Sequence, residues 1–368
     1  MFLFERLAGV GTFAIILVFV CFLISICKNN KSIGIILFLY TIILSIMGFF
    51  FVPYITTDLY RIYEYLDYFR TLDFKTFFET YQNSSVVGGY VFYWLISKTG
   101  ENRLLTAVSA FISFSCIFYL LRKTIKKYNI SSKNVAITLF FIMATGVFIT
   151  TTGVRTIMSI SLVAFCFFRE TVEKKFRLYH ILLYVIAAFM HNFTVVIILI
   201  RLLIPLFDNT KRIGKKTAYI ISLGGIIAFM AFNMKDLLDA VYRRAQGYIS
   251  GNAYSYFWGY IIGALILLAV LISLIQYSKI QKEENKDLNQ FKLYSIVLMV
   301  ISVAFSFEYS IFARTSSILL PIMYAPCFML SLEKSSDSKR NNMIILLVAI
   351  LVVSFLRGEM SAYKFFVL

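Results

Sequence analysis

Arg155 is the charged residue whose surroundings most need a chemical explanation, because it lies in a short polar break, residues 149–158, between two apolar runs. Three threonines and a glycine precede it, and they offer hydroxyl groups and close approach of the backbone. A guanidinium group inside an apolar run needs an anion, a cluster of carbonyl groups or a water-filled cavity. Since its fork matches phosphate oxygens and its charge does not titrate, this break is a candidate anion site.

Other charged residues stand near the ends of apolar runs: Asp58, Arg61, Glu64, His191, Glu308 and Arg314. Arginines of this kind suit a diphosphate group. A nearby carboxylate or neutral imidazole would be able to accept a proton from an attacking hydroxyl group. The residue types therefore indicate group transfer from a phosphorylated molecule.

Each of these residues also has a structural interpretation. Arg155 and Arg314 have a second explanation as helix-end arginines that extend to the headgroup region. Asp58 is also explained as a helix N-cap or as the ion-pair partner of Arg61, and His191 as a helix-end residue bonded to a carbonyl group. The polar residues around Arg155 favour an anion-binding site. Such a site requires that the predicted helices bring these residues to the same side of the membrane.

The composition indicates an integral membrane protein. Of 368 residues, 60% are hydrophobic and only 15% are charged, against about 25% charged in an ordinary globular domain. The net charge of +17 is explained by membrane orientation and contact with anionic lipid, so it does not imply a nucleic acid partner. It is also compatible with a substrate that carries phosphate.

The apolar runs predict an all-α fold, a polytopic bundle of about twelve transmembrane helices in one domain over residues 1–368. The predicted crossings are residues 8–27, 32–53, 103–121, 134–151, 156–168, 178–190, 193–207, 217–233, 257–277, 291–307, 312–330 and 341–356. The N-terminal run has no small-residue cleavage site, which favours a retained helix. The runs beside Arg155 and beside His191 are short for a full crossing.

Two polar segments, residues 54–102 and 235–256, are predicted to be long loops. In the first, apolar residues recur at helical spacing: Leu59, Ile62, Tyr63, Leu66 and Phe69. This pattern predicts an amphipathic helix on the membrane surface. Residues 88–96 are too few to span, and we expect them to enter the membrane and return while shielded by protein.

The basic residues orient the predicted bundle. If the N-terminus is outside, every strongly basic loop falls on the inner side, as the positive-inside rule requires. Both long loops, Arg155, His191 and the turn at 308–314 then fall on the outer side, whereas His180 and Arg201 fall on the inner side and are left out of the site. Aromatic residues such as Tyr60, Tyr90 and Tyr93 crowd the outer loops, as an interfacial belt or as a groove for sugars.

Metal and disulfide chemistry are not indicated. The five cysteines form no CxxC pair, and their positions in apolar runs favour packing. Two histidines alone cannot build a metal site. We therefore expect no metal and no cofactor.

The chain resembles the EpsG-like branch of the Wzy-type polysaccharide polymerases of bacterial envelopes. The resemblance rests on five motifs: Thr57–Tyr63, Gly89–Tyr90, Gly153–Arg155, Met190–Thr194 and Arg314 opening a late span. Their order and spacing extend over about residues 55–330.

The resemblance implies a membrane glycosyltransferase that moves a growing glycan from undecaprenyl diphosphate onto a lipid-linked repeat unit. Capsule, exopolysaccharide and O-antigen are the candidate products. The implied place is the bacterial inner (cytoplasmic) membrane, with the site on its periplasmic or extracellular side. The expected partners are the undecaprenyl-diphosphate-linked oligosaccharide, membrane lipid, a flippase and a chain-length regulator protein.

The expected site has three catalytic residues and a set of substrate-binding residues. His191, Asp58 and Arg155 form the first group. The second group is Arg61, Tyr60, Glu64, Tyr90 and Arg314. An arginine-rich pocket lowers the pKa of both histidine and carboxylate, which favours neutral His191 as the base and Asp58 as a residue that orients the acceptor sugar or an arginine.

Two alternatives remain at this stage. A flippase or transporter of lipid-linked glycans would share the helices and the arginines, although such proteins often show paired halves, which this sequence lacks. A glycosyltransferase that adds a single sugar from a polyprenyl-phosphate donor would use similar lipids.

Overall fold

The structure is a computed structural model of the chain. It describes residues 2–51, 53, 58–84, 86–207, 253–280 and 286–356. All regular elements in these ranges are helical. The predicted crossing at 217–233 and most of the loop at 235–256 lie outside the described residues.

The described helices correspond to the predicted apolar runs, although α1 begins six residues before its predicted start and α6 ends seven residues after its predicted end. They are α1 (Phe2–Ile26), α2 (Asn30–Phe49), α3 (Asp58–Thr71), α4 (Phe74–Tyr81), α5 (Val87–Ser97), α6 (Leu104–Tyr128), α7 (Ser132–Thr152), α8 (Val154–Thr171), α9 (Leu178–Met190), α10 (Asn192–Phe207), α12 (Ala253–Tyr277), η1 (Lys286–Leu288), α14 (Asn289–Ala304), α15 (Tyr309–Ala313), η2 (Arg314–Leu319), α16 (Leu320–Glu333) and α17 (Asp337–Leu356). The break that the sequence predicts at Arg155 is a single residue, Gly153, between α7 and α8.

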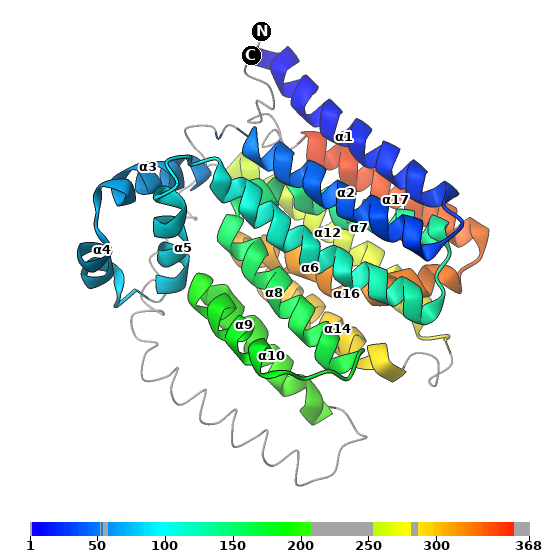
Figure 1. Cartoon of the computed structure of the whole chain (residues 1–368). Helices are drawn as coiled ribbons and strands as arrows, with labels where there is room; N and C mark the ends of the chain where they lie inside the picture. Colours follow the sequence, from blue (N-terminus) through cyan, green and yellow to red (C-terminus); the bar gives the residue numbers. More distant parts are fainter. Residues whose placement is uncertain are drawn as a thin grey trace.

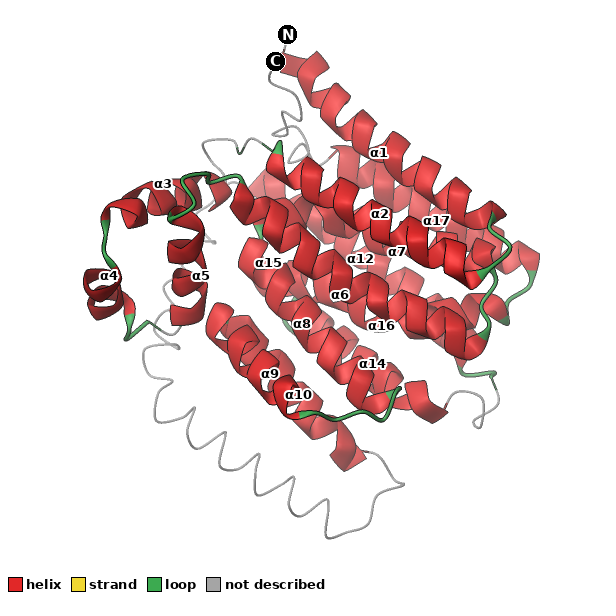
Figure 2. Cartoon of the chain, in the orientation of Figure 1, coloured by secondary structure: helices red, strands yellow, loops and turns green. Residues whose placement is uncertain are grey.

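Long helices run back and forth through one bundle, and α3, α4 and α5 lie together at one end of it (Figure 1). Within the bundle, α6 packs against α2 and α8, and α7 packs against α1 and α16. Short loops join α6 to α7 and α8 to α9 (Figure 2), so consecutive helices are antiparallel. As a result, the start of α8, the end of α9 and the start of α10 share the end of the bundle where α3–α5 lie.

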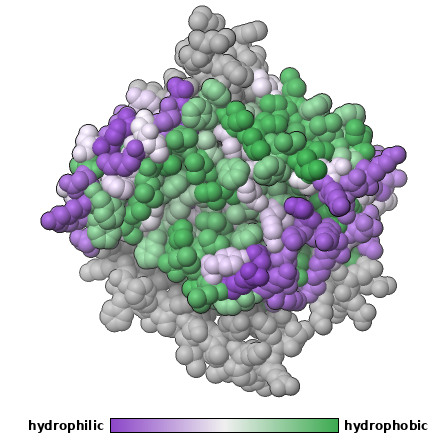
Figure 3. Space-filling view, viewed as in Figure 1, coloured by the Kyte–Doolittle hydropathy of each residue, from purple (hydrophilic) through white to green (hydrophobic). Residues whose placement is uncertain are grey.

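The surface of the bundle is apolar where a membrane would contact it. Hydrophobic side chains cover the middle of the face in Figure 3, between hydrophilic zones over α3 and α4 and over the opposite helix ends. Large side chains such as Ile15 and Ile345 remain 71% and 68% exposed. Such exposure is costly in water and ordinary in lipid.

Four of the described helices are long and apolar enough to cross a membrane. They are Asn30–Phe49, Leu104–Tyr128, Phe257–Tyr277 and Ile311–Glu333. Shorter apolar helices, including α9, α10 and α14, accompany them. The chain is thus an all-helical membrane protein in its described part, and the number of about twelve crossings stays a prediction.

The segment α3–α5 is held together by its own aromatic core. Leu59, Leu66 and Phe69 are buried on one face of α3, which confirms the predicted amphipathic helix. The Phe69 ring lies 5.2 Å from Phe77 and 5.1 Å from Tyr81 of α4, centre to centre. These edge-to-face contacts stabilise the unit without requiring that it cross the membrane.

Hydrogen bonds close the helix ends in this unit. Lys98, after α5, donates to the carbonyl groups of Phe69, Arg70 and Leu72 at 2.5–3.2 Å and so satisfies the last turn of α3. Asp73 caps α4 by accepting from the Thr76 amide at 2.8 Å, and this bond lowers the pKa of its carboxyl group.

A buried polar cluster ties α8, α9 and α10 together near the opposite end. Glu170 is only 5% exposed in its side chain, and it accepts hydrogen bonds from Arg201 at 2.5 Å and from Tyr184 at 3.2 Å. His180 is fully buried beside it, with Nδ1 3.7 Å from the Glu170 carboxylate. These contacts give Arg201 and His180 structural partners.

The late apolar run is not a single regular helix. Its first part is the short helix α15, and η2 then forms a π-helical turn that leads into α16. The hydroxyl groups of Thr315 and Ser316 donate to the carbonyl groups of Ile311 and Phe312 at 2.8 and 2.7 Å. Hydroxyl groups that bond to the carbonyl group four residues back often bend a helix, and a π-helical turn is a further cause of a kink.

Two glycines of α12 allow this irregular segment to pack closely. A Cβ atom at Gly259 would collide with the Tyr309 ring, and one at Gly263 would collide with Phe312 and Ser316. The spacing of four residues places both glycines on one helix face, which is the small-residue pattern of close helix contacts in membranes.

Candidate active site

Arg155 lies beside two tyrosine rings at the start of α8. Its guanidinium carbon is 5.3 Å from the centre of the Tyr93 ring and 5.8 Å from that of Tyr90, both on α5. Rings at this distance attract the cation through their electron-rich faces. We call the arrangement of Arg155, Tyr90 and Tyr93 the tyrosine seat.

The charge in the tyrosine seat is not neutralised within the described part of the chain. None of the described carboxylates forms an ion pair with Arg155, and its buried Nη1 has no hydrogen-bond acceptor there. Burial raises the pKa of the Tyr93 phenol, with Arg155 acting against the rise. The phenol therefore stays neutral and supplies no counter-charge, so the seat suits an anion from outside.

A glycine pair lets α5 approach both α8 and α9. A Cβ atom at Gly89 would lie 2.7 Å from Cδ of Arg155 and 3.0 Å from the carbonyl oxygen of Met190. A Cβ atom at Gly88 would lie 2.9 Å from Cβ of Phe189. Contacts this close exclude any larger residue without movement, and they join three distant parts of the sequence at one place.

His191 occupies the break between α9 and α10, directly after Met190. Its backbone is extended, and its Nδ1 accepts a hydrogen bond from the Phe193 amide at 3.1 Å, as an N-cap does. A neutral imidazole that accepts at Nδ1 carries its proton on Nε2. In this arrangement Nε2 is a hydrogen-bond donor. His191 can act as a base only if the hydrogen bond between Nδ1 and the Phe193 amide is broken.

Buried hydroxyl groups hold the His191 break beside α8. Thr194 donates to Ser159 at 2.8 Å, and Ser159 donates to the carbonyl group of Thr156 at 2.9 Å. Ser159 lies one helical turn after Arg155 on the same face of α8. The structure thus brings Arg155, Tyr90 and the backbone next to His191 into one neighbourhood.

The predicted residues of α3 lie at the margin of this neighbourhood. Asp58 and Arg61 form an ion pair with each other, and their side chains are 70% and 65% exposed. This pairing is the structural alternative that the sequence left open. Asp58 still lies close enough to Tyr93 to contribute to the raised pKa of that phenol. Tyr60 is half-buried and Glu64 exposed on the same helix.

Arg314 lies on a different element of the bundle, the π-helical turn η2. It opens η2, which packs against α7, α12 and α14, and its side chain is half-buried. One turn later, Ser317 and Ile318 line a small apolar cavity together with Ile157 of α8. The structure therefore places Arg314 on an element that packs against α7, α12 and α14, while the tyrosine seat is formed by α5 and α8.

Sequence reasoning missed part of this site. Tyr93 was grouped with the interfacial aromatic residues, yet it is the nearer ring to Arg155 and only 1% exposed. A usable signal was the spacing of Tyr90 and Tyr93, three residues apart on one helix face directly after a glycine pair. Ser159 gave no such signal.

The described residues contain no group of three or more histidine, cysteine, aspartate or glutamate side chains that would hold a metal ion. What they do contain is a fixed cation, tyrosine hydroxyl groups and an imidazole N–H at one end of a bundle. These groups are suited to bind an anionic group that carries hydroxyl-rich substituents.

A comparison with protein families gives a match. The model of the EpsG family matches residues 73–366, a range that includes the tyrosine seat, His191 and Arg314 and leaves out Asp58 and Arg61. No curated protein and no solved structure matches the chain.

Proposed function

Because this chain belongs to the EpsG family, we propose that it is a polysaccharide polymerase. It would transfer a growing glycan from undecaprenyl diphosphate to a lipid-linked repeat unit. The observation that carries the proposal is the tyrosine seat, where Arg155 has no carboxylate partner among the described residues. The diphosphate of the donor would supply the missing anion.

In the proposed reaction, a hydroxyl oxygen of the acceptor sugar attacks the anomeric carbon that is bonded to the diphosphate. The bond between that carbon and the diphosphate oxygen breaks, and undecaprenyl diphosphate leaves with the electron pair. Arg155 stabilises the charge that develops on the leaving diphosphate. Arg314 of η2 is assigned as the further cation for this group, and a base takes the hydroxyl proton.

The base is assigned to His191 or to Asp58. His191 directly follows Met190, whose carbonyl oxygen lies against Gly89 beside Arg155. Its Nδ1, however, caps α10. Asp58 is an acceptor at its carboxylate, but it is exposed and paired with Arg61. We retain His191 as the first candidate, with Asp58 orienting the acceptor sugar, and the variants described below separate the two roles.

The reaction is proposed for the outer face of the bacterial cytoplasmic membrane. Among the described residues, the basic loops that follow α6, α8 and α16 lie at the end of the bundle away from the tyrosine seat (Figure 1), and such loops stay on the cytoplasmic side. On this proposal the products are surface polysaccharides such as capsule, exopolysaccharide or O-antigen.

Replacing Arg155 by lysine tests the proposal directly. Lysine keeps the charge but cannot form two parallel hydrogen bonds with a phosphate. Since a hydrogen bond to a charged group contributes about 1.5–3 kcal/mol, we expect Arg155→Lys to lower the rate of polymerisation by about ten- to a hundredfold. Surface glycan from a strain that carries only this variant should run on a gel as single repeat units with few longer chains.

Arg103→Lys is the matched control, because Arg103 lies at the same end of the bundle in a half-exposed position outside the seat. It should give the full ladder of chain lengths. Normal chain length with Arg155→Lys, in protein shown to be present in the membrane, would reduce Arg155 to a structural anchor. Loss of all exported glycan in a strain without the protein would instead indicate a flippase, and a lipid-linked product one sugar longer would indicate a single-sugar transferase.

A further inference from the structure

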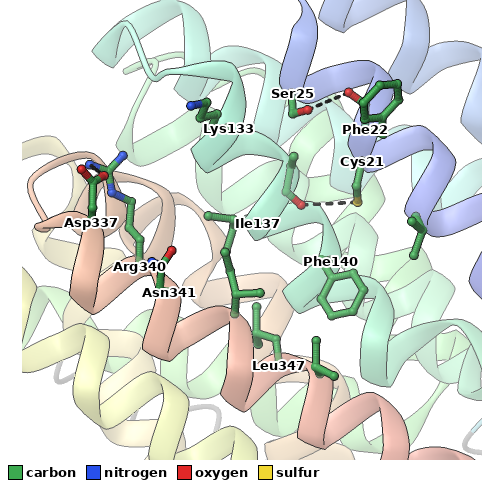
Figure 4. Close-up of a pocket in the computed structure, with 14 residues that line it drawn as sticks. Cys21, Phe22, Ser25, Lys133, Ile137, Phe140, Asp337, Arg340, Asn341 and Leu347 are labelled. Atoms are coloured by element: carbon green, nitrogen blue, oxygen red, sulfur yellow. Dashed lines mark hydrogen bonds and ion pairs between the residues drawn. The ribbon is translucent and has the colours of Figure 1, made fainter.

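A groove with a volume of about 690 Å³ lies between α1, α7 and α17, far along the bundle from the tyrosine seat. Figure 4 shows α7 between the other two helices, with Phe140 and Leu347 inside the groove. Its volume lies in the range of roughly 300–1,000 Å³ that is typical of ligand pockets. Its lining is largely apolar, and Phe22 and Ile344 remain 57% and 40% exposed.

The groove changes from polar to apolar along all three helices. Ser25, Lys133 and Arg340 lie at one end of it, where α1 ends and where α7 and α17 begin. Phe140 and Val348 lie two turns further along α7 and α17. A gradient of this kind along the helix axes matches a molecule with a polar head and an apolar chain that is aligned with the helices.

Two basic residues, Lys133 and Arg340, line the polar end of the groove. Arg340 pairs with Asp337 at 2.7 Å through Nη2, but that carboxylate is 91% exposed and leaves the guanidinium only partly neutralised. The Nε of Arg340 is buried, and the described part of the chain offers it no hydrogen-bond acceptor. Lys133 is exposed and forms no ion pair with any described residue. The groove lining at this end thus holds two cations and one solvated carboxylate. A second carboxylate, Glu333, lies nearby and accepts hydrogen bonds from the start of α7.

This end of the groove is also the end of the bundle that carries the basic loops. Ser132 donates to the carbonyl group of Ser25 at 3.1 Å, so the start of α7 lies against the end of α1. Lys28 and Lys31 follow directly in the sequence. If the bundle lies in a bilayer, the cations are at headgroup level and the apolar part of the groove is at the level of the acyl chains.

We propose that the groove binds an anionic glycerophospholipid. Its headgroup phosphate lies on Lys133 and Arg340, and one acyl chain lies against Ile137, Phe140 and Ile344. Basic pockets between transmembrane helices recognise anionic headgroups in this way. The site lies at the opposite end of the bundle from the tyrosine seat, so it is separate from the proposed reaction and does not depend on it.

The test compares lipids bound to the purified chain. The protein is reconstituted in nanodiscs with equal amounts of phosphatidylglycerol and phosphatidylcholine of the same acyl chains, and the retained lipid is counted by native mass spectrometry. We expect one retained phosphatidylglycerol, favoured over phosphatidylcholine by about tenfold, since each basic residue near the headgroups adds to the preference. A second series replaces phosphatidylglycerol by undecaprenyl phosphate.

Two variants alter the groove in different ways. The double variant Lys133→Gln, Arg340→Gln should bring the two lipids to about equal retention. Ile344→Trp fills the apolar part without changing the charge, and it should lower the retention of both lipids. The control Lys126→Gln, Lys175→Gln removes two exposed charges outside the groove lining and should retain phosphatidylglycerol as the unchanged protein does.

Four outcomes would overturn the proposal. These are no preference in the unchanged protein, an equal loss in the control variant, a preference for undecaprenyl phosphate, or a dimer of the chain in place of bound lipid. Thermal unfolding in detergent shows whether each variant is folded. If the charge variant does not fold, Ile344→Trp and the competition between lipids decide the question.

Discussion

At the scale of single residues, the central feature is a cation that aromatic rings hold and no described carboxylate neutralises. Each ring contributes about 0.5–2 kcal/mol of attraction, which orients Arg155 without reducing its charge. A carboxylate in the same place would orient the arginine too, but it would compete with an incoming phosphate. Because Tyr90 and Tyr93 are neutral, they orient Arg155 and leave its positive charge available to bind an anion.

His191 is a second residue whose role can be separated by substitution. His191→Ala removes both the cap of α10 and any proton acceptor, so it should abolish chain extension under either hypothesis. Asparagine is a good N-cap but cannot act as a base. If His191 is the base, His191→Asn should abolish chain extension as well, measured as the glycan ladder of a strain that carries only the variant.

Asp58→Asn is the companion to these variants. It should reduce chain extension and leave residual activity if Asp58 orients the acceptor. Normal polymer length with His191→Asn, together with its loss in Asp58→Asn, would make His191 a capping residue and Asp58 the base.

At the scale of elements, the position of α5 depends on its glycine pair. We predict that Gly89→Ala lowers polymer length, because the added Cβ would lie 2.7 Å from Cδ of Arg155 and 3.0 Å from the Met190 carbonyl oxygen. Either the Arg155 side chain leaves the tyrosine seat or α5 moves away from α9. The glycan ladder measures the effect. The control is Gly11→Ala in α1, where a Cβ would meet no atom within 4 Å, and a normal ladder in both variants would contradict the close packing.

The contact of α8 with α10 depends on the buried pair of Glu170 and Arg201. Glu170→Ala leaves Arg201 without its carboxylate in a position where its side chain is only 15% exposed. Breaking a buried pair from one side costs about 3–5 kcal/mol, so we expect a clear fall in the thermal unfolding temperature in detergent. The double variant Glu170→Ala, Arg201→Met should recover much of this loss.

Asp58→Ala is the control for stability, since its exposed pair with Arg61 contributes about 0–1 kcal/mol. If Glu170→Ala unfolds no earlier than Asp58→Ala, the polar cluster does not hold α8 and α10 together.

At the scale of the whole molecule, the proposed function requires the tyrosine seat and the basic loops to lie on opposite sides of the membrane. In a variant without the five native cysteines, single cysteines at exposed Asn83 and exposed Lys126 test this arrangement. A thiol reagent that does not cross membranes should label Asn83→Cys in intact cells, and Lys126→Cys only after the membrane is opened. Labelling of both in intact cells would overturn the orientation.

The sequence predicts the helices well because apolar runs and their polar breaks are local properties. The limits of α9 agree with the prediction, and those of α7 differ by two residues or fewer. The breaks at Gly153 and His191 also lie where the sequence predicts an interruption between two apolar runs. The site was less predictable, because the contact of Gly89 with Arg155 and the bond between Ser159 and Thr194 join distant parts of the chain. Hydropathy and periodicity carry no information on such contacts, and the π-helical turn at Arg314 was not foreseen for the same reason.

That π-helical turn gives the late segment one residue to spare. A π turn accommodates one residue more than an α-helical turn does. A chain shorter by one residue between Arg314 and Leu319 would be free to close this turn as ordinary α-helix, and the helix on either side would stay nearly in register because the wide turn had absorbed the extra residue. Phe312 would then keep its place at Gly263. The same deletion within α16, where no wide turn absorbs it, would rotate everything before it by about 100° and would therefore displace Arg314 far more.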